Sequence, residues 1–148
     1  MLNEDTGLIL PPSDIEGWNR YSDTVIDKHL EMNGPEASYK EQTFIHKIRE
    51  LSQKAVILIT DDKHDPRKAV RFEYDPSELP FITQWKHFKP GEYVMAVEPC
   101  NNHVKGVSWE NENGTLKTIL PGEKKNFSFT ISFFDSPDGI KEVIRQMT

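Results

Sequence analysis

The sequence lacks several features that define whole classes of protein. It has a single cysteine, Cys100, which excludes an intramolecular disulfide and a cysteine-rich zinc site. No apolar run approaches the roughly 18 residues that a membrane-spanning helix needs. Residues 1–12 carry two acids and no base, unlike a signal peptide, and no glycine-rich phosphate loop occurs. We therefore expect a cytoplasmic protein with no membrane partner.

Positive charge is scarce as well. Lysine and arginine total 18 against 24 acidic residues, so the net charge is −6, and the bases do not form a stripe. Nucleic acid is a poor partner for such a surface, because binding its phosphates requires a positive face. The 148 residues, 36% of them hydrophobic, are enough for one core. We predict a single domain over residues 1–148.

Short alternating segments separated by turns dominate the chain from residue 42 onward. Turn signals recur about every 8–12 residues, which is typical of a β-sandwich or barrel. Residues 42–51 fit a helical face or a strand, and Asn113-Gly114, flanked by VSWEN and TLKTIL, predicts a hairpin. We predict an all-β, antiparallel β-sandwich with a short C-terminal helix in residues 136–147. Residues 1–41 are predicted to be irregular. The expected strands are residues 55–60, 69–75, 81–88, 92–98 and 126–134.

The predicted strand 92–98 ends on a carboxylate, Glu98, and Pro99 follows at once. Because side chains alternate along a strand, Glu98 shares its face with the small Val94 and Ala96, which leaves room for a ligand. Pro99 lacks an N–H and is expected to end the strand and stiffen its exit. A carboxylate held beside apolar walls would suit a general base. A solvated glutamate at a strand end explains the same pattern.

Other polar and aromatic residues could surround such a carboxylate. Trp85 offers a flat apolar surface for the C–H face of a sugar, and Lys86 offers a charged donor. Neighbours on a strand point to opposite faces, so only one of them can share a pocket with Glu98. Arg71 could reach a ligand or lie in solvent, and Asn101 could bind hydroxyl groups or serve a turn.

Three further features carry alternatives. His46 fits either a site histidine or a hydrogen-bonded polar group within a sheet. The turn Asp61–Asp65 contains oxygen and nitrogen ligand types, yet acidic hairpin turns are common, so we predict no metal. Cys100 has no histidine and asparagine at the spacing of a nucleophilic triad. No cofactor is expected.

Residues 74–101, YDPSELPFITQWKHFKPGEYVMAVEPCN, resemble the C-terminal half of bacterial aldose 1-epimerase (galactose mutarotase-like) proteins. They are more similar to an uncharacterised branch of that family. The shared order is an Arg-containing strand, a Leu-Pro turn, a Trp followed by a base, a Gly-aromatic strand and Glu-Pro-x-Asn. The opening MLNEDTGLILPPSD and the segment EQTFIH are also similar to that branch.

The resemblance implies a galactose mutarotase-like supersandwich, of which this chain would be one part. It implies that Glu98 is the catalytic base, taking a proton from the anomeric hydroxyl of a free monosaccharide. It also implies that the sugar site is lined by Trp85, Lys86, Asn101 and Arg71. Metal and cofactor are not implied.

The resemblance also implies a missing part. The acid histidine of the family lies in a His-x-Asn segment that would align upstream of Met1. We therefore expect this chain to be the C-terminal part of a larger domain and to be inactive alone. The alternatives are a homo-oligomer or a chain that pairs with a missing N-terminal half. The alternative function is a carbohydrate-binding β-sandwich without turnover.

Overall fold

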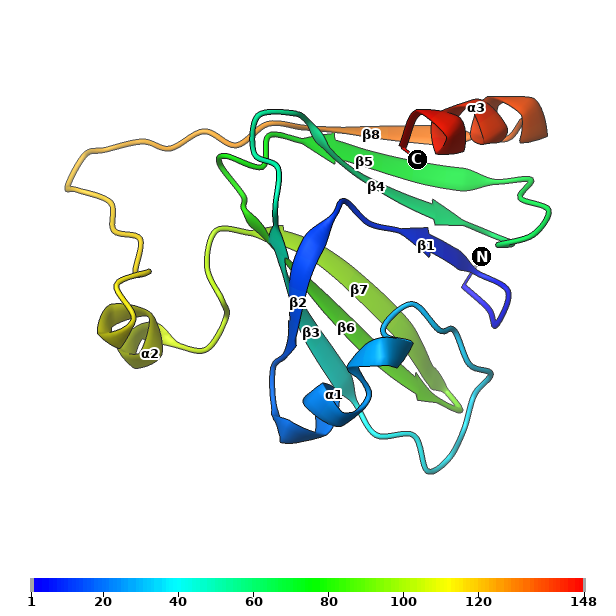
Figure 1. Ribbon diagram of the computed structural model, residues 1–148, viewed down its shortest axis with the longest axis horizontal. Coiled ribbons are helices and arrows are strands. Elements are labelled where there is room, and N and C mark those ends of the chain that lie inside the picture. Colours follow the sequence, from blue (N-terminus) through cyan, green and yellow to red (C-terminus); the bar gives the residue numbers. More distant parts are fainter. Residues whose placement is uncertain (1, 148) are drawn as a thin grey trace.

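The computed structural model describes residues 2–147, which form two four-stranded antiparallel sheets packed face to face (Figure 1). The all-β sandwich predicted from the sequence is confirmed. Sheet A has the order β1 (Gly7–Ile9), β4 (Ala55–Thr60), β5 (Ala69–Tyr74) and β8 (Phe129–Phe134). Sheet B has the order β2 (Ser13–Gly17), β3 (Gln42–Ile48), β6 (Phe81–Lys89) and β7 (Glu92–Cys100). The helices are α1 (Arg20–Thr24), the 3-10 turn η1 (Ile26–Lys28), α2 (Val107–Glu112) and α3 (Pro137–Met147).

The main core lies between the two sheets, where each contributes one apolar face. Ile57 and Tyr74 from sheet A meet Ile82 and Phe88 from sheet B, all at most 2% exposed. A second apolar cluster lies on the other side of sheet A, where Leu58 packs against α3. The C-terminal helix predicted from the sequence is thus confirmed, and it covers the outer face of sheet A.

The prediction that residues 1–41 are irregular is wrong for the first part of that segment. β1 pairs with the edge of sheet A and β2 with the edge of sheet B, and α1 and η1 follow. Strands of three and five residues are too short to show an alternating pattern in the sequence. Their pairing with longer strands decides their conformation.

Residues 29–41 remain without helix or strand and cross the inner face of sheet B, the face that points to sheet A. Met32 and Tyr39 from this segment join the core. The backbone N–H of Glu36 donates to the carbonyl of Phe88 at 2.9 Å, and the Tyr93 hydroxyl donates to the carbonyl of Asn33 at 2.6 Å. This segment therefore covers the part of sheet B that lies beyond sheet A.

The hairpin predicted around Asn113-Gly114 is wrong. VSWEN lies in α2, and TLKTIL is neither helix nor strand. Asn113 caps the C-terminus of α2, and Gly114 follows with φ of +67°. A glycine in this left-handed conformation just after a helix is the usual helix stop, so the Asn-Gly pair ends a helix here instead of joining strands.

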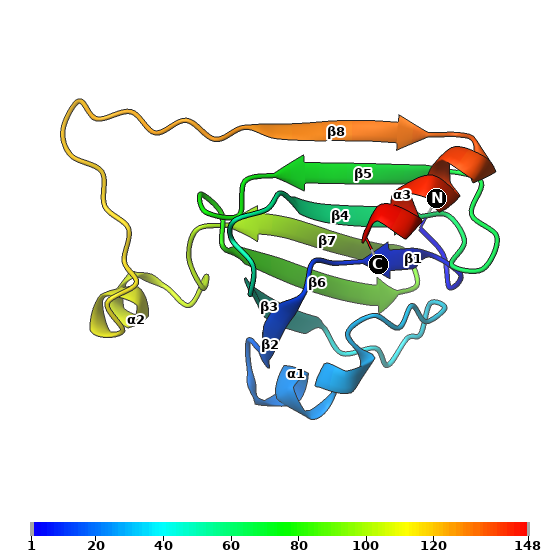
Figure 2. The ribbon, with the colours of Figure 1, turned by 45° about the horizontal axis from the view of Figure 1, so that its top comes forward.

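β7 and β8 are edge strands on the sides of their sheets opposite β2 and β1. β7 does not stop at Glu98, as predicted, but continues through Pro99, which pairs with Ile82, to Cys100. A proline is tolerated in an edge strand because its missing N–H would point away from the sheet. β8 forms an edge of sheet A (Figure 2), and its Phe133 is 79% exposed. An apolar row along β8 therefore stays uncovered within the described chain.

Candidate functional site

Glu98 and Trp85 lie on the same face of sheet B, its outer face, which points away from sheet A. Thr83 pairs with Glu98, and Trp85 pairs with Ala96, so these are adjacent pairs two residues apart. Diagonal neighbours across antiparallel strands lie about 7–8 Å apart, so Trp85 and Glu98 are neighbouring positions on this face. The small side chain of Ala96 lies on the same face, so no large side chain covers this position between Trp85 and Glu98.

Glu98 is exposed, and its carboxylate makes no hydrogen bond within residues 2–147. The expectation of apolar walls around this carboxylate is therefore wrong for the described chain. β7 is an edge strand, so only one neighbouring strand could supply such walls. The carboxylate can reach a ligand without any rearrangement of the sheet.

The rings of Trp85 and His87 stack against each other on this face. Their rings are 6.0 Å apart between centroids and differ by 6° in plane. The indole N–H of Trp85 donates to Glu41 at 2.5 Å, and His87 Nε2 lies 3.0 Å from a carboxylate oxygen of Glu92. These partners fix both rings, so the surface beside Ala96 is rigid. Sequence reasoning missed His87, although its place two residues after Trp85 on a strand indicates the same face.

Lys86 points to the inner face and is 1% exposed. Its Nζ donates to the backbone carbonyls of Lys28 at 2.9 Å and Glu31 at 3.1 Å. Burial lowers the pKa of Lys86 to about 8, although the nearby Glu31 carboxylate raises it. Only one of the two neighbours, Trp85, therefore shares a face with Glu98, and Lys86 binds the cover of sheet B instead.

His46 is buried in the same inner face. Gln84 donates to the carbonyl of His29 at 2.7 Å, so its amide oxygen faces His46 Nε2 at 3.0 Å. His46 Nε2 therefore donates, and Nδ1 accepts from the Ser13 hydroxyl at 3.2 Å. Burial lowers the pKa of His46 to about 4, the hydrogen bond to Gln84 opposes this shift, and His29 adds to it. The structure supports the alternative of a hydrogen-bonded core histidine.

Arg71 and Asn101 are not brought to Glu98 in the described chain. Arg71 lies on β5 of the other sheet, opposite Leu58, and forms an ion pair with Glu73. Asn101 lines a separate hollow of about 350 Å³, together with residues of the 115–128 segment. Of the five residues predicted to form the sugar site, Glu98 and Trp85 therefore share the outer face of sheet B.

The acidic turn after β4 uses its carboxylates for backbone contacts. Asp61 accepts from the N–H groups of Arg67 and Lys68, both at 2.9 Å, and Asp62 accepts from that of His64 at 2.6 Å. These hydrogen bonds lower the pKa of both carboxyl groups. Across residues 2–147, no group of three or more His, Cys, Asp or Glu side chains is arranged to hold a metal ion.

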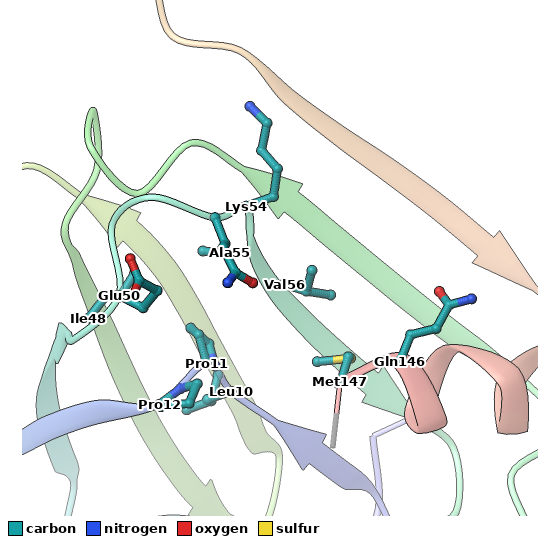
Figure 3. A pocket seen from close by; sticks show the side chains of 11 residues that line it. Leu10, Pro11, Pro12, Ile48, Glu50, Lys54, Ala55, Val56, Gln146 and Met147 are labelled. Atoms are coloured by element: carbon teal, nitrogen blue, oxygen red, sulfur yellow. The ribbon is translucent and has the colours of Figure 1, made fainter.

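A hollow of about 300 Å³ lies where the turn from β1 to β2 approaches α3 (Figure 3). Leu10, Pro11 and Pro12 form one side, and Val56 and Met147 form another. None of the predicted site residues lines it, and its walls carry no paired acid and base. The outer face of sheet B is the better candidate.

Comparison with known proteins identifies the family. Residues 1–133 match the family described as "Domain of unknown function (DUF4432)". The chain belongs to this family. No curated protein matches the chain. Within the described residues, no helix has the length and apolar character to span a membrane.

One solved structure has the same fold. It is a protein from Klebsiella pneumoniae subsp. pneumoniae described as a "putative aldose 1-epimerase", with 21% identity and a TM-score of 0.86. The match covers 99% of this chain and 38% of the other. The chain therefore has an aldose 1-epimerase-like fold, which confirms the resemblance seen in the sequence, and it spans well under half of its neighbour's length.

Proposed function

We propose that this chain provides the base-bearing side of an aldose 1-epimerase-like site that interconverts the anomers of a free monosaccharide. The observation that supports the proposal is that Glu98 and Trp85 occupy neighbouring positions on the outer face of sheet B, where Glu98 is exposed. The shared fold with the Klebsiella protein supports it. Metal and cofactor are not part of the proposal.

The chemistry requires one base and one acid. Glu98 takes the proton of the anomeric hydroxyl while the bond from C1 to the ring oxygen breaks and the ring oxygen is protonated. C1 rotates in the open form, and the ring closes on the other face of the carbonyl. Each positioned proton-transfer group contributes about 10²–10⁴-fold to the rate. Trp85 would hold the C–H face of the sugar.

Lys86, Asn101 and Arg71 keep the sugar-contact roles predicted from the sequence only if further polypeptide completes the site. The chain covers 38% of its neighbour, and the apolar row on β8 is exposed. Both observations support the predicted pairing, with a second copy or with the rest of the sandwich. Lys86 would first have to leave its two backbone carbonyls.

A non-catalytic carbohydrate-binding sandwich is the second candidate function. The half-buried Trp85 on this face favours it, since an indole ring can bind the C–H face of a sugar without any proton transfer. The exposed Glu98 carboxylate, which lacks a hydrogen bond, would then only accept one from a sugar hydroxyl. Exchange measurements distinguish the two functions.

The test uses the full chain with D-glucose, D-galactose and D-mannose. Exchange between α and β anomers is measured by two-dimensional NMR, and binding by saturation transfer. We expect accelerated exchange with at least one sugar, and Glu98→Gln should slow it by about 10²–10⁴-fold while binding persists. Glu112→Gln is the matched control, because Glu112 is exposed and lies outside the site.

Binding with exchange at the uncatalysed rate would establish the binding function and remove the epimerase proposal. A normal exchange rate in Glu98→Gln would remove Glu98 from the mechanism. Absence of both binding and exchange would overturn both functions for this chain.

A further inference from the structure

The edge strand β8 carries a row of large apolar side chains on one face, formed by Phe129, Ile131 and Phe133. Ile131 lies opposite Phe72 of β5, and Phe72 packs against the main core. The row therefore lies on the inner face of sheet A. Its three side chains are nevertheless 57%, 47% and 79% exposed, so the other elements within residues 2–147 leave much of their surface in solvent.

β8 lacks the features that protect the other sheet edges. Soluble proteins discourage strand pairing at an edge by keeping the strand short or by placing charges and proline in it. β1 and β2 have three and five residues, and β7 carries Glu92, Glu98 and Pro99. Residues 126–134 contain no charged residue, no proline and no glycine. An unprotected apolar edge of this kind is suited to pairing with a strand of another chain.

Opposite charges stand at the two ends of the apolar row. Phe127 extends the row by one position, Lys125 precedes it and Asp135 follows it. Residues 123–128 are neither helix nor strand, and the segment runs on from β8 beyond the two sheets (Figure 2). When this segment is extended, Lys125 and Asp135 share the face of the row, because side chains two residues apart point the same way. Both are exposed and have no ion pair within residues 2–147.

This pattern is complementary to itself when two β8 strands lie antiparallel. Pairing centred on Thr130 places these residues of the two copies opposite each other: Lys125 and Asp135, Phe127 and Phe133, Phe129 and Ile131. Opposite charges and apolar pairs are the combinations that stabilise neighbouring antiparallel strands. A parallel arrangement would place like charges together. A shift of one residue would turn one row to the other face, and a shift of two would place a charge opposite a phenylalanine.

We propose that β8 is the docking surface for a second copy of this chain, and that the two β8 strands pair antiparallel about Thr130. The two four-stranded sheets A then form one continuous sheet across the dimer. A two-fold interface requires a surface that is complementary to itself, whereas a different polypeptide on this edge would need no match between the two ends of β8. The surface lies on sheet A, so the inference is independent of the function proposed for the outer face of sheet B.

Sedimentation equilibrium of the full chain tests the association. The mass of the wild type should approach twice 17.1 kDa as the concentration rises. Ile131→Lys places a charge in the middle of the apolar row, and we expect it to raise the dissociation constant of the dimer by about 100-fold or more. Leu120→Lys is the matched control, because Leu120 is 72% exposed and lies outside β8. It should associate like the wild type.

Exchange of the two terminal charges tests whether the partner is a second copy. Lys125→Asp or Asp135→Lys alone creates like-charge pairs at both ends of the paired strands, so each should raise the dissociation constant by about 10-fold at low salt. The double variant restores opposite charges in both pairs and should associate like the wild type. Both side chains are exposed, so the folded monomer should tolerate the exchange. A double variant that associates more weakly than either single variant would overturn self-pairing in this register.

A further measurement uses the wild-type chain alone. In a mixture of ¹³C-labelled and unlabelled chains, isotope-filtered NMR should show contacts between the Phe127 ring of one copy and the Phe133 ring of the other. A wild-type chain that stays monomeric as its concentration rises would overturn the inference and leave the apolar row to a different polypeptide. A dimer that Ile131→Lys does not weaken, or one without these contacts between rings, would also overturn it.

Discussion

Both faces of sheet B carry polar side chains, but the two faces differ in how far these side chains are buried. On the inner face, His46, Gln84 and Lys86 are at most 1% exposed, and each side chain has a hydrogen-bond partner. On the outer face, Glu98 is exposed and Trp85 is half-buried. Neighbouring residues of a strand point to opposite faces, so one residue is buried in the core and the next lies at the surface.

The comparison shows what buried polar groups are for in this fold. The carbonyls of Lys28, His29 and Glu31 lie at the end of η1 and in the irregular segment that follows it. Gln84 and Lys86 supply donors to these carbonyls. Buried backbone groups need such partners, so the inner polar residues hold the cover on the sheet. On the outer face, the Glu98 carboxylate is exposed and can meet a ligand.

The largest effect on stability is expected when Gln84 of the inner face is changed to leucine (Gln84→Leu). The change keeps the volume but leaves His46 Nε2 and the His29 carbonyl without partners in the core. Each orphaned buried group costs about 1–3 kcal/mol, so we expect the free energy of unfolding to fall by about 2–6 kcal/mol. Urea unfolding measures it, with the exposed Gln53→Leu as control. A loss no greater than in that control would show that the inner face is not a structural network.

The second prediction uses the pH dependence of stability. The pKa of His46 is about 4 in the folded protein against about 6.5 when exposed. The unfolded chain therefore takes up a proton first as the pH falls. Stability is lost progressively from about pH 6.5 to about pH 4, by about 3 kcal/mol in total from this group. Urea unfolding between pH 6.5 and 5 should show this slope in wild type and a flatter one in His46→Gln. Equal slopes would contradict a neutral, buried His46.

The smallest effect on stability is expected on the outer face. Trp85→Ala removes one hydrogen bond and one stacked pair at the surface, so the free energy of unfolding should fall by no more than about 1 kcal/mol. Saturation transfer from D-galactose should nevertheless weaken strongly. Phe88→Ala, an inner-face control on the same strand, should instead lose about 3–5 kcal/mol of stability. Similar losses in both variants would break the contrast between the faces.

Much of the sandwich could be predicted because the signal is local. Residues 55–60, 69–74 and 81–88 alternate or are continuously apolar, and each lies in a strand of the structure. The Asn113-Gly114 pair misled, since the same dipeptide serves a hairpin or a helix end depending on what precedes it. At the site, alternation predicted that Trp85 or Lys86, not both, would join Glu98, without deciding which.

Contacts between segments that are distant in the sequence could not be predicted from local patterns. His103 and Glu110 are separated by a loop, and their pairing follows from the packing of α2 near Phe81 and Glu16. Nothing in the local pattern distinguishes His103 from other turn residues.

The sequence alone determined the strands β4, β5 and β6, the C-terminal helix and the resemblance to the aldose 1-epimerase fold, because alternation and motif order are properties of neighbouring residues. The tertiary structure decided which face is covered and which is open. That choice depends on where the 29–41 segment packs, and it leaves Lys86 buried and Glu98 accessible. Burial depends on the packing of the whole chain. Which side chains are buried and which can meet a ligand was therefore decided only by the tertiary structure.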